Sequence, residues 1–116
     1  NYNMYRKENS EFETYLDKEI YGAELVTVIN KAINKNEQNA VDKDNKGIYL
    51  NNDENSIKIE ILITDNDTIY PMEIIYNGGT NNFINNYRDI QFKCVDIKYH
   101  STTHKVKYLL FEQITE

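Results

Sequence analysis

The clearest helical pattern in the chain lies between residues 21 and 36, where apolar residues recur at three- and four-residue spacing. The apolar stripe consists of Leu25, Val26, Val28, Ile29, Ala32 and Ile33. The opposite side carries Glu24, Thr27, Asn30, Lys31 and Lys35. One amphipathic helix cannot bury such a stripe alone, so we expect the rest of the chain to supply an apolar surface for it to cover.

Residues 56–64 carry the clearest strand pattern, because isoleucine occupies every second position from Ile57 to Ile63. Residues 65–67, Asp-Asn-Asp, predict a tight turn, and residues 68–70 predict the returning strand. Pro71 has no backbone N–H, so it should end that strand or place it at the edge of a sheet.

A second hairpin is predicted from residues 91–99 and 105–111. Phe92 and Cys94 fall on one face of the first strand, whereas Val95 and the alternate residues after it fall on the other. This change of phase indicates a β-bulge or a strand covered on both sides. In the second strand Val106, Tyr108 and Leu110 alternate, which predicts that they share a face.

The remaining elements have weaker patterns. Residues 1–20 predict a first helix, with Ser10 and Glu13 at capping-box spacing, and residues 19–21 at its end are expected to be extended. Residues 48–50 predict a short strand, residues 72–76 a helical turn, and Thr80 is expected to cap a short helix that ends at Tyr87.

Together these elements predict an α+β fold, in which N-terminal helices pack on one face of an antiparallel sheet of four to five strands. The other face of the sheet should be polar and solvated. The length of 116 residues fits one domain, residues 1–116, and the start at Asn1 instead of Met suggests an excerpt of a longer chain.

A net charge of −6 argues against nucleic acid or an anionic membrane surface as the main partner. The charge is uneven, since residues 91–111 contain four lysines and one acidic residue, Asp96. These lysines, at positions 93, 98, 105 and 107, are most simply a solvated face of the hairpin.

His100 and His104 flank the turn of the second hairpin and are the candidates for a metal site. Neutral imidazole is a good ligand for transition metals, but a zinc site needs three or four ligands. The loop between the histidines contains no Asp, Glu or Cys. We therefore expect an ordinary polar turn, no metal and no cofactor.

Two other patterns partly resemble known functional sites, a calcium-binding loop and a nucleophilic cysteine. Asp42 and Asp44 begin a segment like a calcium loop, but Lys46 takes its fifth position and Asp53 its twelfth, where a bidentate Glu is usual. Cys94 could be a nucleophile beside a histidine, yet its place within a strand is typical of a small buried apolar residue. Neither pattern predicts a functional site.

Ten tyrosines and no tryptophan are present, and most of these tyrosines should be half-buried positions of the fold. If one cluster forms a contact surface, we expect it to include Tyr70, Tyr76 and Tyr87, which surround the irregularities at Pro71 and at Gly78 and Gly79.

Two stretches carry a resemblance, residues 19–33 (EIYGAELVTVINKAI) and residues 92–100 continuing to 110–112 (FKCVDIKYH to LFE). They resemble extracytoplasmic domains of uncharacterised single-span membrane proteins of A/T-rich Gram-positive anaerobes, and the layout is similar to that of pilin-like and pseudopilin-like proteins. The resemblance implies an N-terminal membrane span upstream of Asn1 and a helix laid on an antiparallel sheet. It carries no functional residue.

The sequence thus predicts a non-enzymatic domain at the extracytoplasmic face of the membrane, which binds a protein partner or self-assembles. The alternative is a cytosolic module that binds a small ligand or regulates another protein. A third alternative is an enzyme, which would need a cleft that gathers His100 or His104 with Asp42, Asp44 or Glu73.

Overall fold

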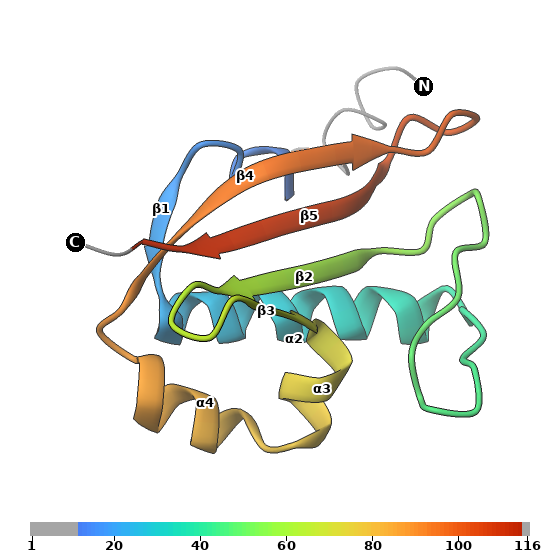
Figure 1. Ribbon diagram of the computed structural model, residues 1–116. Helices are drawn as coiled ribbons and strands as arrows, with labels where there is room; N and C mark the ends of the chain where they lie inside the picture. Colours follow the sequence, from blue (N-terminus) through green and yellow to red (C-terminus); the bar gives the residue numbers. More distant parts are fainter. Residues whose placement is uncertain (1–11, 115–116) are drawn as a thin grey trace.

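The computed structural model describes residues 12–114 and consists of a five-stranded sheet with three helices on one of its faces (Figure 1). In chain order the elements are β1 (Glu19–Tyr21), α2 (Gly22–Gln38), β2 (Lys58–Ile63), β3 (Thr68–Pro71), α3 (Met72–Asn77), α4 (Thr80–Tyr87), β4 (Gln91–Tyr99) and β5 (Val106–Gln113). The predicted α+β class, with helix packed on one face of a sheet, is confirmed.

The strands lie in the order β1-β4-β5-β2-β3. The two predicted hairpins, β2–β3 and β4–β5, both form, and β1 adds to β4 in the antiparallel sense. Strands β2 and β5 join the hairpins as a parallel pair, so the sheet is mixed and the prediction of a wholly antiparallel sheet is wrong. Pro71 ends β3 at one edge of the sheet, as predicted, and edge strands are where sheets tolerate a residue without a backbone N–H.

The core forms between α2 and the face of the sheet that carries the isoleucines of β2. All six residues of the predicted apolar stripe of α2 are buried, and so are the four alternating isoleucines from Ile57 to Ile63. Phe92, Cys94 and Phe111 complete this face from β4 and β5. The two strongest periodic patterns of the sequence therefore meet in one core, as expected for a helix that covers a sheet.

The alternation predicted for β5 is wrong after its first residue. Val106 is buried, but the next buried positions are Leu109 and Phe111, while Tyr108 and Leu110 are half-buried on the outer face. The reason is a bulge, because Tyr99 pairs with Val106 and the preceding β4 residue pairs with Tyr108, which leaves Lys107 as an extra residue. The predicted bulge in β4 is confirmed at Val95.

The helix predicted for residues 1–20 is wrong over 14–18, whereas the extended conformation predicted for residues 19–21 is confirmed as β1. Residues 1–11, including Ser10, lie outside the described part of the chain. Residues 14–17 form turns, with one bridge from Leu16 to Cys94, and residues 19–21 form β1. The segment takes this form because it pairs with β4: Asp17 N–H donates to Cys94 C=O at 2.9 Å. Tertiary pairing here outweighs local helix propensity.

Two smaller predictions also need correction. Thr80 is the first residue of α4 and forms no side-chain cap, since Gly79, with a φ of 102°, takes the cap position. Residues 48–50 form only an isolated bridge, between Tyr49 and Lys43, instead of a strand. The helical turn predicted at 72–76 is confirmed as α3.

Asn36 of α2 is fully buried although it is polar. Its side chain bonds to the backbone of Ile57, just before β2, as a neighbouring strand would. Its amide accepts a hydrogen bond from Ile57 N–H and donates one to Ile57 C=O, both at 2.9 Å. The loop that leads into β2 is thereby tied to the helix.

Replacing Asn36 with Ala is expected to lower the free energy of unfolding by about 3 kcal/mol, because two buried backbone groups lose their partners. Asn34→Ala, at an exposed position of the same helix, is the control and should change it by less than about 0.5 kcal/mol. Denaturation in urea measures both variants. Equal effects would mean that the paired amide of Asn36 does not stabilise the loop.

Candidate functional site

A groove with a largely apolar lining lies between the end of β3 and the two short helices α3 and α4, with a volume of about 210 Å³. Pro71 leads directly from the edge strand into α3, and Gly78 and Gly79 turn the chain into α4. The groove is lined by Ile63, Tyr70, Ile74, Ile75, Gly78, Gly79, Asn82, Phe83, Asn86 and Tyr87. We call it the α3–α4 groove.

The floor of the groove is apolar and well fixed. Ile63, Ile75 and Phe83 are buried members of the core. The rings of Phe83 and Tyr87 lie 4.9 Å apart, and the ring of Phe92 lies 6.2 Å from that of Tyr87. Burial raises the pKa of the Tyr87 hydroxyl. Packed aromatic rings of this kind form a preformed surface, because their side chains are already ordered and lose little conformational entropy when a partner binds.

The rim combines amide side chains with one exposed apolar residue. Asn82 and Asn86 of α4 are exposed, and Ile74 of α3 is 49% exposed although it lines an apolar groove. Asn82 also donates a hydrogen bond to Gly78 C=O at 3.4 Å, across the turn. A partner that covers this exposed isoleucine and the apolar floor beside it would remove apolar surface from water, and that burial would contribute favourable binding free energy.

Of the three tyrosines singled out in the sequence, Tyr70 and Tyr87 line this groove from β3 and α4. Tyr76 belongs to α3, is 43% exposed and does not line the groove. Sequence reasoning missed Ile74, Phe83 and the two asparagines, because the groove depends on how α3 and α4 pack against each other. The Gly78-Gly79 turn was the available signal.

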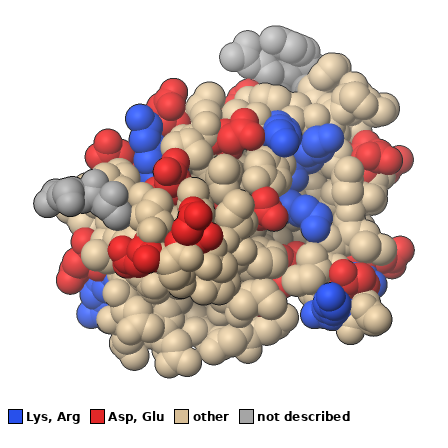
Figure 2. All heavy atoms as spheres, viewed as in Figure 1, with Lys and Arg blue, Asp and Glu red and all other residues tan. Residues whose placement is uncertain are grey.

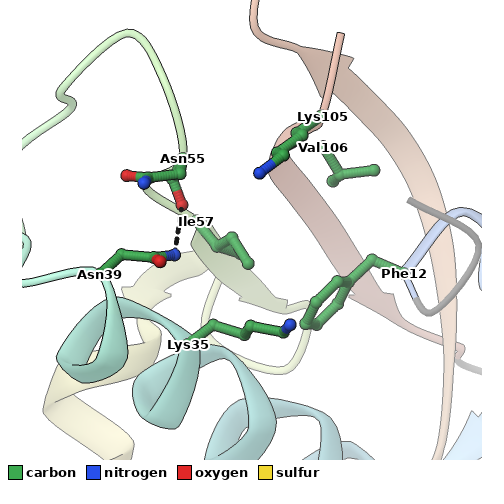
Figure 3. A pocket seen from close by; sticks show the side chains of 7 residues that line it. All are labelled: Phe12, Lys35, Asn39, Asn55, Ile57, Lys105 and Val106. Carbon is green, nitrogen blue, oxygen red and sulfur yellow. Dashed lines mark hydrogen bonds between the residues drawn. The ribbon is translucent and has the colours of Figure 1, made fainter. Parts of the chain in front are cut away.

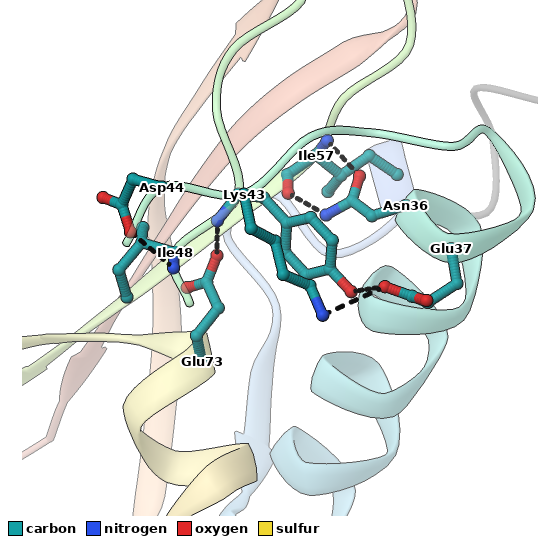
Figure 4. A network of polar contacts seen from close by, with 8 residues as sticks. Asn36, Glu37, Lys43, Asp44, Ile48, Ile57 and Glu73 are labelled. Atoms are coloured by element: carbon teal, nitrogen blue, oxygen red, sulfur yellow. Dashed lines mark hydrogen bonds and ion pairs between the residues drawn. The ribbon is translucent and has the colours of Figure 1, made fainter. Parts of the chain in front are cut away.

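The acidic residues that suggested a calcium loop form a structural network instead (Figure 4). The Asp44 carboxylate accepts hydrogen bonds from Lys46 N–H at 2.8 Å and Ile48 N–H at 3.0 Å. These backbone donors lower the pKa of Asp44. Its carboxylate therefore closes a turn, a common role of Asp in loops.

A second carboxylate, that of Glu73, is buried in α3 and accepts a hydrogen bond from Tyr49 N–H at 2.9 Å. The Tyr49 hydroxyl donates to Glu37 at the end of α2, and Lys43 pairs with Glu37 at 3.3 Å (Figure 4). Burial and the Glu37 carboxylate raise the pKa of Tyr49. These bonds fasten the loop between α2 and β2 to both helices.

The predicted metal-ligand candidates lie at the far end of the β4–β5 hairpin. His100 is 1% exposed, and its Nε2 lies 2.8 Å from Ser56 C=O, whereas its Nδ1 has no hydrogen-bond partner within the described residues. His104 is exposed and adopts a positive φ of 61°. Over residues 12–114, no three His, Cys, Asp or Glu side chains are placed to hold a metal ion together.

Cys94 is fully buried between neighbouring strands. Burial raises the pKa of its thiol to about 11, which disfavours the reactive thiolate at neutral pH. The enzyme alternative, which is a separate prediction, needed His100 or His104 in one cleft with Asp42, Asp44 or Glu73. Instead, Cys94, His100 and Glu73 each pack within the described fold at separate places.

A smaller cavity of about 80 Å³ lies between the end of α2 and the β4–β5 hairpin (Figure 3). Lys35, predicted on the solvent side of α2, is half-buried here, and its side chain extends along the cavity towards Phe12. Asn39 closes one side by donating to Asn55 C=O at 3.5 Å. A cavity of this volume holds only a few water molecules, so it is a weaker candidate than the α3–α4 groove.

Between residues 12 and 114 no helix combines the length and the hydrophobicity that crossing a bilayer requires. Comparison of the chain with protein-family models, with curated protein sequences and with solved structures gives no significant match.

Proposed function

We propose that this domain is a non-enzymatic protein-binding module, and that the α3–α4 groove holds apolar side chains of a protein partner. The observation that carries the proposal is the combination of a fixed apolar floor with Ile74 exposed at the rim. Protein interfaces derive most of their affinity from a few such anchoring pockets, surrounded by polar groups that exclude water.

The size of the groove favours a protein partner over a small molecule. Pockets for small ligands usually enclose about 300–1,000 Å³. The α3–α4 groove has about 210 Å³, which fits one or two large side chains. The exposed amides of Asn82 and Asn86 supply hydrogen-bonding groups at its rim.

Two further apolar side chains of β3 and α3 are exposed. Ile69 of the edge strand β3 and Tyr76 of α3 are 51% and 43% exposed. Ile69 alternates with the groove residue Tyr70 along β3 and therefore lies on the outer face of the sheet, whereas Tyr76 belongs to the same helix as Ile74, so a partner seated in the groove can extend its contact along α3. A continuous surface is needed, since a specific interface buries roughly 800 Å² on each partner.

The proposed setting is the extracytoplasmic face of the membrane, where a pilin-like assembly role would bring such domains together. This setting is based on the sequence resemblance alone. Reading the coding sequence upstream of Asn1 tests it: about 20 consecutive apolar residues would support an anchored envelope domain. A polar or globular extension would favour the cytosolic binding module.

Ile74→Asp is expected to weaken partner binding by at least roughly tenfold, because a carboxylate would have to be desolvated against the apolar floor. The variant should fold normally, since the side chain is already half exposed. Leu50→Asp, at a 47% exposed apolar position on the loop after α2, is the matched control.

The partner is first identified by photo-cross-linking in the native cells, with the reactive amino acid placed at Asn86 on the rim or at Leu50. The identified protein, or a second copy of this domain, is then purified and titrated against both variants. Binding that tolerates Ile74→Asp, or cross-links that form equally from Leu50, would contradict the proposal.

A further inference from the structure

A second surface lies on the outer face of the sheet, which the helices do not cover. Three lysines, Lys58, Lys98 and Lys107, line one concave pocket there, together with Asn51, Ser56 and Tyr108. Its volume is about 220 Å³. We call it the lysine pocket.

Pairing of the strands brings the three lysines together. Tyr108 of β5 is paired with Lys58 of β2 on one side and with Lys98 of β4 on the other, so these residues form a row across three strands. The bulge in β5 adds Lys107 beside Tyr108. A bulge changes the direction of a side chain, and here it brings a third ammonium group to the outer face.

The pocket is positively charged on a chain with a net charge of −6. No carboxylate lines it, and the one ion pair found among residues 12–114, Lys43 with Glu37, lies elsewhere. A group of lysines is visible over the hairpin end of β4 and β5, with acidic residues on either side (Figure 2). The like charges of these lysines repel one another, and an anion bound in the pocket would offset that repulsion.

The floor and the boundary of the pocket are also defined. Lys98 Nζ lies 4.9 Å from the centre of the Tyr108 ring, and the Tyr108 hydroxyl donates to Glu60 at 2.7 Å. Glu60 and Asp96 lie two residues further along their strands on the same face. They limit the positive surface to the hairpin end, so a long polyanion such as nucleic acid would meet carboxylates as it left the pocket.

We propose that the lysine pocket binds a single phosphate group. Lysine ammonium groups bind phosphate as point charges with several N–H donors each, and lysines from three neighbouring strands line this pocket. The side chains of Ser56 and Asn51 bond to each other at 3.2 Å, which leaves the ammonium groups as the main donors. The phosphate can belong to a soluble phosphomonoester or to a lipid headgroup.

The test uses the purified domain with glycerol 3-phosphate and inorganic phosphate as soluble probes, and phosphatidylcholine vesicles with or without phosphatidic acid as the lipid probe. Lys98→Gln combined with Lys107→Gln should weaken binding by roughly tenfold or more, since two of three charges are removed. Lys93→Gln, on the outer face of the same β4 strand but opposite Glu112, is the matched control and should bind as the parent does.

Binding of the soluble probes that only the double variant loses would identify a soluble phosphate ligand. Binding of only the vesicles with phosphatidic acid, with the same loss, would identify a lipid headgroup. No binding of any probe to the parent domain would overturn the proposal, and so would equal weakening by Lys93→Gln, which indicates general charge attraction. Equal thermal unfolding of the three proteins ensures that the variants are folded.

Discussion

Ile29→Asp is expected to unfold the domain. Ile29 is fully buried at the centre of the α2 stripe, where the helix packs on the core face of the sheet. A carboxylate without a partner at this depth costs at least about 4 kcal/mol. Because the total stability of a domain is about 5–15 kcal/mol, this loss removes most of it. Circular dichroism and urea denaturation of the variant measure the effect.

The control for this prediction is Lys31→Asp, two residues further along α2 on its exposed side. It should change the free energy of unfolding by less than about 1 kcal/mol, since the group stays in water. If the two variants were equally stable, the buried face of α2 would be assigned wrongly and the proposed packing of helix on sheet would fail.

Gly22→Ala is expected to destabilise the domain by about 3 kcal/mol, although alanine is the better helix former. Gly22 is the first residue of α2, and a Cβ there would lie 2.0 Å from Tyr87 C=O at the end of α4. Gly22 N–H is also held by Ile90 C=O at 2.9 Å, so the backbone cannot retreat freely. Helix propensity favours alanine by about 1 kcal/mol, and the steric clash outweighs it.

Thermal unfolding measures this second prediction, and a fall of the melting temperature on the order of 10 °C is expected. Ala23→Ser, at the exposed neighbouring position, is the control and should shift it little. A melting temperature that rises in Gly22→Ala would mean that propensity dominates and that α4 does not press against the start of α2. Since Tyr87 lines the α3–α4 groove, such a result would also remove one wall of the candidate site.

The elements that the sequence predicted well are those in which a regular apolar pattern continues over many residues and only one face is buried. The α2 stripe and the isoleucines of β2 are examples, because a register error in either would move every apolar side chain into water. The short turn at 65–67 was predictable for a different reason: Asp67 adopts a positive φ of 51°, a conformation that Asp tolerates.

The elements that were predicted wrongly depend on partners distant in sequence. Residues 14–18 have a helical pattern, but the backbone groups of Asp17 and Lys18 pair with Cys94 of β4. The alternation in β5 breaks at the bulge of Lys107, which no local pattern indicates. The parallel pairing of β2 with β5 is likewise invisible in the sequence, since an alternating strand has the same pattern in either direction.

The candidate sites were predictable only in part. Tyr70 and Tyr87 were singled out, but Ile74 and Phe83 become groove residues only when α3 and α4 pack together. The lysines of residues 91–111 were interpreted as one solvated face. The fold separates them, because Lys93 lies opposite Glu112 whereas Lys98 and Lys107 share a pocket with Lys58, more than thirty residues away in the chain.

The two proposed sites lie on opposite sides of the sheet. The helices lie on one side of the sheet (Figure 1), and the α3–α4 groove belongs to that side, whereas the lysine pocket lies on the outer face. Because no residue lines both, a protein partner and a phosphate group can be bound together, and each set of variants should leave the other site unaffected.

The central claim, that the α3–α4 groove is the docking surface, is tested most directly by amide hydrogen exchange on the complex with the cross-linked partner. We expect the amides of α3 and α4, residues 72–87, to exchange more slowly when the partner is bound, with little change in β4 and β5. Slower exchange on the outer face of the sheet, with α3 and α4 unchanged, would contradict the claim.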